Sequence, residues 1–189
     1  DPREELSIEE LFQRYKAVGQ LSQLKELIFR MQLREGARLN LGRIFLNVDL
    51  ELLGHAEPEP TPEGLEVVLE LSERDVVYDV EKHIAEAERW RRLGYKFAID
   101  DFGSGFISLP FIAQLVPNFI KMNRSTIMEA VESAEFSSFL RDLIVAMRNY
   151  SPDGVIAEGI ETEEELEAAR GLGVLQVQGY LTGKPKRMD

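Results

Sequence analysis

Segments of strand and helix character alternate along this chain, and this alternation limits its possible folds more than any other feature. Six apolar segments rich in β-branched and aromatic residues are expected as strands: 43–49, 66–72, 95–101, 118–122, 154–159 and 174–179. Helical periodicity covers roughly 7–18, 22–34, 79–94 and 162–173, and a long helical stretch between the fourth and fifth strands includes 135–150; a further helix is expected between the third and fourth strands. Strand–helix units with short connections predict a parallel sheet with helices outside it.

Chain length separates two versions of this fold. The 189 residues and a hydrophobic content of 44% are enough for one domain with a substantial core. A complete eight-stranded α/β barrel needs about 250 residues, or about 200 at the low end. The alternatives are an open doubly wound sheet and a barrel lacking its first part. Because no strand precedes the first helix, we expect residues 1–189 to form a single, N-terminally truncated TIM-like (β/α)8 barrel domain that is incomplete.

Composition excludes several kinds of site. Cysteine is absent, which removes disulfides and thiolate zinc sites, and the two histidines, His55 and His83, have no partner at ligand spacing. A net charge of -12 argues against binding to a DNA or RNA backbone. An acidic protein that binds a phosphate ligand would need bound cations. The sequence shows no membrane-spanning segment and no signal peptide, so we expect a cytoplasmic protein.

Every expected strand ends in a polar or ionisable residue. These residues are Asn47, Glu70, Asp100 with Asp101, Lys121 followed by Asn123, Glu158 and Gln178. In a parallel barrel the carboxyl ends of all strands meet on one face, which is where such folds place their chemistry. Six such ends in register therefore predict a functional site.

The residue types at these strand ends indicate the chemistry. Carboxylates and amides are hard oxygen ligands that suit Mg²⁺, Mn²⁺ or Ca²⁺ rather than zinc. Two such ions and a lysine, facing an anionic substrate, fit metal-assisted phosphoryl transfer. The alternative is a buried layer of ion pairs without function. The pair of aspartates in DDFG, which is also compatible with a simple turn, would form the shared edge of a metal site.

The stretches NVD, LELSE, AIDDFGSGF, FIKMN, VIAEGIET and VQGY, in this order, resemble the EAL family of cyclic-di-GMP phosphodiesterases. The resemblance extends from about residue 6 to residue 185. It implies a barrel with one reversed strand that hydrolyses cyclic di-GMP to the linear dinucleotide pGpG with Mg²⁺ or Mn²⁺. It also implies a homodimer, or upstream sensor or cyclase domains.

The resemblance assigns roles to residues of this chain. Asn47, Glu70 and Asp100 resemble ligands of a first metal ion, and Asp101 and Glu158 resemble residues near a second. Lys121, with Glu158 and Asp101, is the implied catalytic group, because the family lysine contacts the attacking water. Ser104, Gln178 and Asn47 are implied substrate contacts. Glu73 is implied to stabilise the DDFG loop. Glu161 is implied to do the same, although a carboxylate before a helix N-terminus is an equally good reading.

Two departures from the family pattern bear on activity. The Glu-Ala-Leu motif that names the family is absent from the chain, and it would precede residue 1. Asn118 and Asn123 stand where the family has aspartates, and Asn123 is expected to weaken the second metal site. The chain is therefore either a phosphodiesterase domain or a degenerate member that binds cyclic di-GMP or a protein partner without hydrolysis. An enolase-like barrel that deprotonates a carbon acid is a third hypothesis, against which QGY and the DDFGSG loop argue.

Overall fold

The computed structural model describes residues 7–72, 80–103 and 109–186, and it shows a six-stranded parallel sheet. The strands follow one another in chain order across the sheet, and each of the five neighbouring pairs is parallel. They are β1 (Arg43–Val48), β2 (Glu66–Ser72), β3 (Lys96–Phe102), β4 (Phe119–Met122), β5 (Gly154–Ala157) and β6 (Gln176–Val177). No pairing joins β1 to β6 within the described residues, so the sheet is an open half-barrel.

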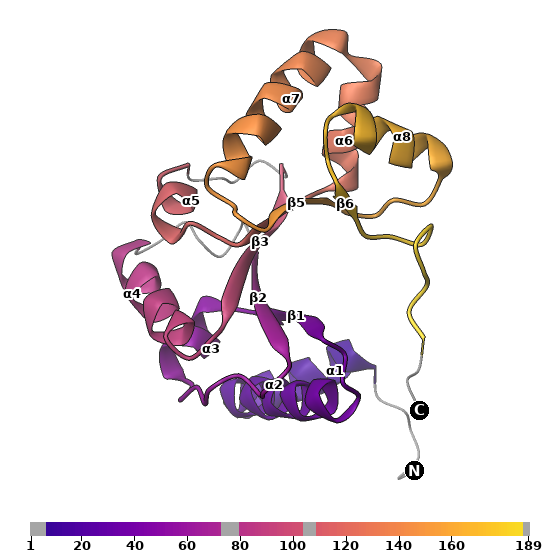
Figure 1. Cartoon of the computed structure of the whole chain (residues 1–189). Helices are drawn as coiled ribbons and strands as arrows, with labels where there is room; N and C mark the ends of the chain where they lie inside the picture. The colour runs from indigo at the N-terminus through magenta and orange to yellow at the C-terminus, as the bar shows by residue number, and fades with distance from the viewer. Residues whose placement is uncertain (1–6, 73–79, 104–108, 187–189) are drawn as a thin grey trace.

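Eight helices accompany the strands in the described part of the chain. They are α1 (Ile8–Ala17), α2 (Leu21–Arg38), α3 (Leu50–His55), α4 (Val80–Arg91), α5 (Leu109–Leu115), α6 (Arg124–Glu132), α7 (Ala134–Arg148) and α8 (Glu163–Gly171). Figure 1 shows them arranged around the outside of the curled sheet. The described helices include none with the length and apolar character needed to cross a membrane. The expected incomplete, TIM-like α/β barrel is confirmed.

Two helices differ from the sequence-based expectation. The short helix α3 was not expected, and it begins because the Asp49 side chain accepts a hydrogen bond from the Leu52 amide at 2.8 Å. The long helical stretch before β5 is divided into α6 and α7 at Ser133. This residue ends α6, and its hydroxyl accepts a hydrogen bond from the Phe136 amide that begins α7. Local capping by short polar side chains explains both differences.

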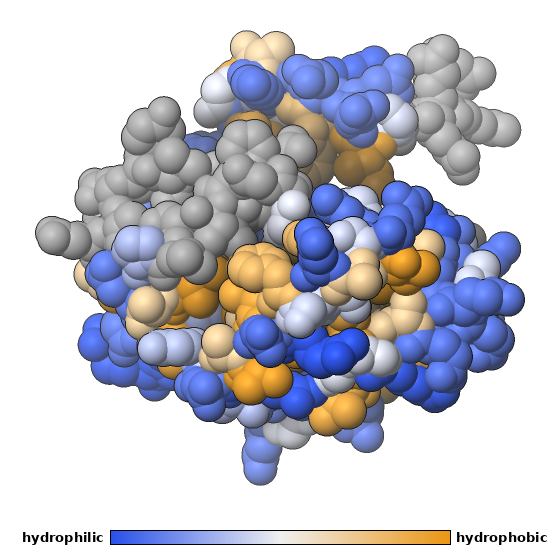
Figure 2. Space-filling model, turned by 90° about the horizontal axis from the view of Figure 1, so that it is seen from above, coloured by the Kyte–Doolittle hydropathy of each residue, from blue (hydrophilic) through white to orange (hydrophobic). Residues whose placement is uncertain are grey.

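The outer face of the sheet packs against the helices in the main hydrophobic core. Trp90 of α4 is fully buried there, and its indole nitrogen donates a hydrogen bond to the Leu53 carbonyl at 3.1 Å. Its ring meets Phe29 of α2 and Tyr95 edge to face, with centroids 5.5 and 4.9 Å apart. These aromatic contacts fix α2 and α4 on the sheet. Seen from above, hydrophobic and hydrophilic residues are interleaved on the molecular surface (Figure 2).

The inner face of the sheet carries three layers of side chains. Its middle layer is a separate apolar cluster made of Val68, Ala98, Phe119 and Ile156, with Phe45 packed against it. Because side chains alternate between the two faces of a strand, residues two positions away in either direction share this face. The starts of β1, β2 and β3 on this face are polar, and so are the strand ends, so one thin apolar layer separates two polar ones.

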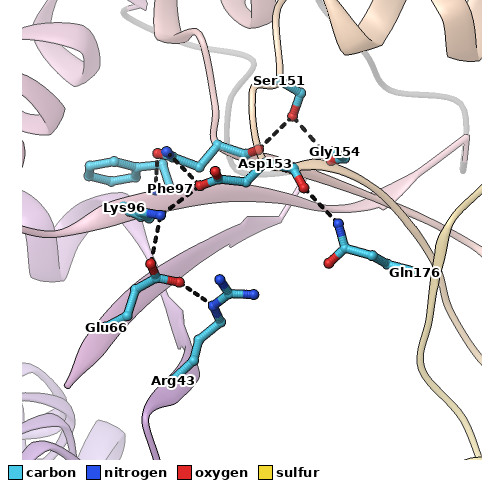
Figure 3. A network of polar contacts seen from close by, with 9 residues as sticks. Arg43, Glu66, Lys96, Phe97, Ser151, Asp153, Gly154 and Gln176 are labelled. Atoms are coloured by element: carbon cyan, nitrogen blue, oxygen red, sulfur yellow. Dashed lines mark hydrogen bonds and ion pairs between the residues drawn. The ribbon is translucent and has the colours of Figure 1, made fainter. Parts of the chain in front are cut away.

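The polar layer at the strand starts is a continuous network, shown in Figure 3. Lys96 lies between Glu66 and Asp153, at 2.6 and 2.8 Å, and the other Glu66 oxygen accepts a hydrogen bond from Arg43. Asn118 donates to Asp153 at 3.1 Å, and its side-chain oxygen accepts from the Phe97 amide. Asn118, one of the two asparagines that replace family aspartates, is therefore a structural residue at the opposite end of β4 from Lys121.

We expect Lys96→Met to reduce the free energy of unfolding by about 1–3 kcal/mol at neutral pH, because it leaves Glu66 and Asp153 without their shared cation. Although burial raises the pKa of both carboxyls, the Lys96 ammonium contributes to holding each pKa below its ordinary value. Stability from this contact is therefore present above about pH 4.5 and is lost as the pH falls.

Denaturant unfolding at pH 7 and pH 3 measures this effect. The difference between Lys96→Met and the unmodified protein should shrink at pH 3, and Lys16→Met on exposed α1 should change little at either pH. An undiminished difference at pH 3 would contradict the electrostatic origin.

Candidate active site

The polar strand ends lie together at the carboxyl end of the sheet. Asn47 lies opposite Glu70 in the β1–β2 ladder, and Asp100 lies opposite Ser72 in the β2–β3 ladder. Asn47 and Glu70 also line one cavity of about 290 Å³, together with Asp49 and Ser72. The parallel register therefore brings the first three of the expected site residues to one edge of the inner face.

Lys121 is the centre of this edge. Its ammonium nitrogen lies 2.5 Å from Glu70 Oε1, 2.5 Å from Glu158 Oε1 and 3.0 Å from Asp100 Oδ1. Lys121 is only 3% exposed and Glu70 only 5%, so these charges interact with little screening by water. Four strands, β2 to β5, thus contribute to one lysine-centred cluster of carboxylates.

A β-bulge places both aspartates of the DDFG stretch beside the lysine. Ile99 pairs with Ile120 and Phe102 pairs with Met122, so Asp100 and Asp101 together lie opposite Lys121 alone. Asp101 adopts a left-handed backbone conformation with φ of 57°, which aspartate tolerates better than most residues. The bulge explains how two adjacent residues of one strand both serve the same edge of the site.

Asn123 connects this bulge to the helix that follows β4. Its side-chain oxygen caps α6 by accepting from the Ser125 amide at 2.9 Å, and its Nδ2 donates to Asp101 Oδ1 at 3.0 Å. Just beyond the bulge, Gly103 has φ of 104°, and a Cβ atom on it would collide with Thr126 of α6. The first turn of α6 therefore packs directly against the DDFG stretch.

The cluster shifts the acidity of its members. Burial raises the pKa of Glu158 to about 7, and Asp100 adds to this while Lys121 opposes it. Burial likewise raises the pKa of Glu70 against the opposing effect of Lys121. The surrounding carboxylates raise the pKa of Lys121 despite its burial, so it stays charged. A carboxyl group with a pKa near neutrality is suited to accept a proton.

The carboxylate oxygens of the site are suitable ligands for a hard divalent cation. In this structure, however, they are arranged around the ammonium group of Lys121. Among the described residues, no group of three or more acidic or histidine side chains is arranged at metal-ligand distances. The carboxylates converge on Lys121 Nζ instead. Glu70 Oε1 is buried and has no hydrogen bond of good geometry in this part of the chain, although Lys121 lies 2.5 Å away. This acceptor has lone pairs available to a cation, so the chemistry of the site fits Mg²⁺ or Mn²⁺.

The other expected site residues are Gln178, Glu161, Glu73 and Ser104, and the structure describes the first two. Gln178 follows β6 and is exposed, and its backbone amide bonds to the Ala157 carbonyl. Glu161 lies in the loop after β5, with its carboxylate 3.6 Å from Arg124. Glu73 and Ser104 fall outside the described residues.

Sequence reasoning missed two residues near the site, Arg124 and Glu165. Arg124 Nε donates to Glu165 Oε1 at 3.0 Å, and Glu165 is only 4% exposed. Glu165 forms a capping box with Thr162 at the start of α8. The pattern Thr-x-x-Glu at 162–165 is a readable signal of that box, whereas its contact with Arg124 joins positions 41 apart in sequence.

The chain is a barrel-type α/β domain, because its parallel sheet curls into a half-barrel and its charged site lies at the carboxyl ends of the strands. The family model for the EAL domain matches residues 3–185. The chain belongs to the EAL domain family.

Relatives found by sequence agree with this assignment. The chain is 30% identical over 184 residues to the cyclic di-GMP phosphodiesterase NbdA of Pseudomonas aeruginosa, covering 90% of this chain and 23% of that protein. It is 31% identical over 121 residues to the cyclic di-GMP phosphodiesterase PdeL of Escherichia coli, covering 64% of this chain and 33% of that protein. The chain thus spans a third or less of the length of these two relatives.

Two solved structures share the fold at lower identity. The PaMucR phosphodiesterase in complex with c-di-GMP has a TM-score of 0.76 at 23% identity, covering 98% of this chain and 81% of that one. BlrP1 of Klebsiella pneumoniae, in a manganese and cyclic di-GMP complex, has a TM-score of 0.78 at 22% identity, covering 93% and 47%. Both similarities show the same chain fold.

We expect Glu158→Gln to stabilise the metal-free protein at pH 8 by about 1–3 kcal/mol. The folded-state pKa of Glu158 is raised from 4.5 to about 7. The stability contributed by its protonated form is therefore present at low pH and is lost as the pH rises through 7. Glutamine has no proton to lose, so the variant avoids this loss of stability at pH 8. At pH 5 the carboxyl is mostly protonated in the folded protein, so the variant should gain much less stability.

Thermal or denaturant unfolding in the presence of a chelator measures the gain at both pH values. Glu129→Gln, on the exposed side of α6, is the matched control. Equal stabilities of Glu158→Gln and the unmodified protein at pH 8 would show that burial does not strain this carboxylate.

Proposed function

We propose that this chain is a cyclic-di-GMP phosphodiesterase domain, which hydrolyses one phosphodiester bond to yield linear pGpG. The observation that carries the proposal is the cluster of Glu70, Asp100 and Glu158 around Lys121, in a chain of the EAL family. Relatives named as phosphodiesterases support it.

The residues of the cluster suit distinct roles in such a hydrolysis. Water attacks phosphorus and gives up a proton, while the bond from phosphorus to the 3′ oxygen breaks and this oxygen takes up a proton to become the 3′ hydroxyl of pGpG. We assign the proton to Glu158, because its carboxylate lies at this edge, 2.5 Å from Lys121 Nζ, and burial raises its pKa. The fixed positive charge of Lys121 attracts the phosphate and offsets charge that develops on its oxygens. Asp100 and Glu70 keep Lys121 oriented.

A divalent cation, Mg²⁺ or Mn²⁺, is part of the proposal. It would be held by Asn47, Glu70 and Asp100, with Asp101 and Glu158 toward a second ion. When bound, it supplies Lewis-acid polarisation of the phosphate and makes water a stronger nucleophile. The manganese complex of the BlrP1 structure supports this expectation for the fold. In this chain Lys121 must share its carboxylates with the ion.

Asn123 favours a second candidate, a receptor that binds cyclic di-GMP without hydrolysing it. The amide of Asn123 donates to Asp101 at 3.0 Å, so an uncharged side chain lies against this carboxylate where an aspartate would add a second acidic group. An amide also carries no charge to attract a second ion. Binding of the ligand without turnover would identify this function.

The proposal also includes the domains or subunits with which this domain acts. Because its relatives are much longer, the domain is expected to act beside sensor or cyclase domains, or as a homodimer. One relative in Pseudomonas aeruginosa is named a bifunctional diguanylate cyclase/cyclic di-GMP phosphodiesterase. The cytoplasmic location stays a prediction.

We expect Asn123→Asp to raise the rate of cyclic-di-GMP hydrolysis at least about tenfold at limiting Mg²⁺ or Mn²⁺, because it adds a ligand and a negative charge beside Asp101. Without metal the two facing carboxylates repel, so the variant should be less stable than the unmodified protein in a chelator. Turnover to pGpG across a metal titration, in the full-length protein, measures the first effect, and thermal unfolding measures the second.

Asn149→Asp, at the exposed end of α7, adds the same charge far from the site and should leave turnover unchanged. Equal turnover by the Asn123→Asp variant and the unmodified protein at every metal concentration would show that Asn123 does not limit activity. Binding of cyclic di-GMP without turnover by either protein would refute the hydrolase and establish the receptor.

A further inference from the structure

The loop 158–162 joins β5 to α8 and carries Glu158, and Glu165 holds its far end. Glu165 Oε2 accepts hydrogen bonds from the amides of Glu161, at 2.7 Å, and Thr162, at 3.4 Å. Its other oxygen, Oε1, accepts from Arg124 Nε at 3.0 Å and from Arg124 Nη2. One buried carboxylate therefore connects this loop to the first residue of α6.

The same loop is tightly enclosed on its other side. The Ile160 amide donates to the Gln178 carbonyl at 3.1 Å, and the Leu181 amide donates to the Ile160 carbonyl at 3.0 Å. A Cβ atom on Gly179 would lie only 2.7 Å from the Ile160 carbonyl carbon. The loop is thus clamped between the glycine of the QGY stretch and the Arg124–Glu165 pair.

The first turn of α6 contacts both loops that carry acidic site residues. Asn123 bonds to Asp101 in the DDFG stretch, and Arg124 bonds to Glu165 behind the Glu158 loop. Glu158 is the first residue after β5. Its amide donates to the Met122 carbonyl at 2.9 Å, which is the last contact with the sheet before the loop begins. Its position against Lys121 therefore depends on how firmly the following loop is held.

We propose that Arg124 and Glu165 are positioning residues of this site, and that their contact holds the 158–162 loop so that Glu158 stays against Lys121. Arg124 is 44% exposed at its side chain and does not contact the carboxylate cluster in the described structure, so it acts through Glu165. The Arg124 guanidinium and the loop amides lower the pKa of Glu165, which keeps the pair charged over the neutral range. The kinetic part of this inference rests on the proposed hydrolysis.

The size of the expected effect follows from geometry. Displacing a reacting group by about 1 Å, even through a remote substitution, can lower turnover about 100-fold. Substrate binding involves many contacts, so KM should change much less. A substitution that only lowered global stability would leave the kcat of the folded fraction unchanged.

The test compares Arg124→Gln, Arg124→Lys, Glu165→Gln and the double variant Arg124→Gln/Glu165→Gln in the full-length protein. Arg170→Gln is the matched control, because it removes an exposed ion pair with Glu167 on the same helix α8. We expect kcat for cyclic di-GMP to fall about 10- to 100-fold in Arg124→Gln and Glu165→Gln, with KM changed less than about threefold.

The pattern across these variants is the decisive result. Residues that act as one unit give non-additive losses, so the double variant should be no slower than the slower single variant. Arg124→Lys should recover part of the rate, and Arg170→Gln should match the unmodified protein. Additive losses, or unchanged kcat in both single variants, would overturn the inference.

Amide hydrogen exchange at Glu158 provides a readout that needs no turnover. Glu165 bonds the Glu161 amide directly but not the Glu158 amide, which bonds to Met122. We expect exchange at Glu158 to accelerate at least about tenfold in Arg124→Gln and not in Arg170→Gln. If the unmodified protein does not hydrolyse cyclic di-GMP, the proposed function fails while faster exchange at Glu158 still supports the positioning role. Unchanged exchange at Glu158 overturns that role whatever the activity.

Discussion

The ammonium group of Lys121, held among three carboxylates, is the interaction on which the site depends. Without this cation, Glu70 and Glu158 would bring negative charge into a poorly hydrated space, which is costly unless a partner neutralises it. The lysine also makes the separate strands one unit, because carboxylates from β2, β3 and the end of β5 all reach one atom on β4. In the proposed enzyme, a divalent cation would compete with the lysine for those same oxygens.

Much of the fold could be predicted from the sequence, because the strands are short, buried and well separated by helical periodicity. The bounds of β2 agree with the expected 66–72, and the six strands occur in the expected order. The short helix α3 and the division between α6 and α7 were missed, since each depends on a single capping side chain, Asp49 or Ser133. The last strand is only two residues long, which apolar pattern alone does not reveal.

The candidate site was less predictable than the fold. The polar strand ends were readable, but the bulge at Asp100 and Asp101 depends on a register between β3 and β4 that no local pattern encodes. Likewise, the resemblance to the family raised a question about Asn123, and only the structure shows its amide bonded to Asp101. Arg124 and Glu165 meet across 41 positions, so their contact follows from tertiary packing. Local sequence patterns identified the polar residues of the site, whereas long-range contacts determine how their side chains are arranged.

The layered inner face has a consequence for how such a domain can vary. Arg43 and Asn47, Glu66 and Glu70, and Lys96 and Asp100 are each four residues apart, so three neighbouring strands span the same distance of about 13 Å between the polar layers. Inserting or deleting one residue between the two polar layers, without a bulge such as the one at Asp100 and Asp101, would turn one charged end of the strand toward the helices. The number of residues between the two polar layers is therefore the same in these three strands. We therefore expect insertions and deletions to be tolerated better in the connections between strands and helices than in the strands between the two polar layers.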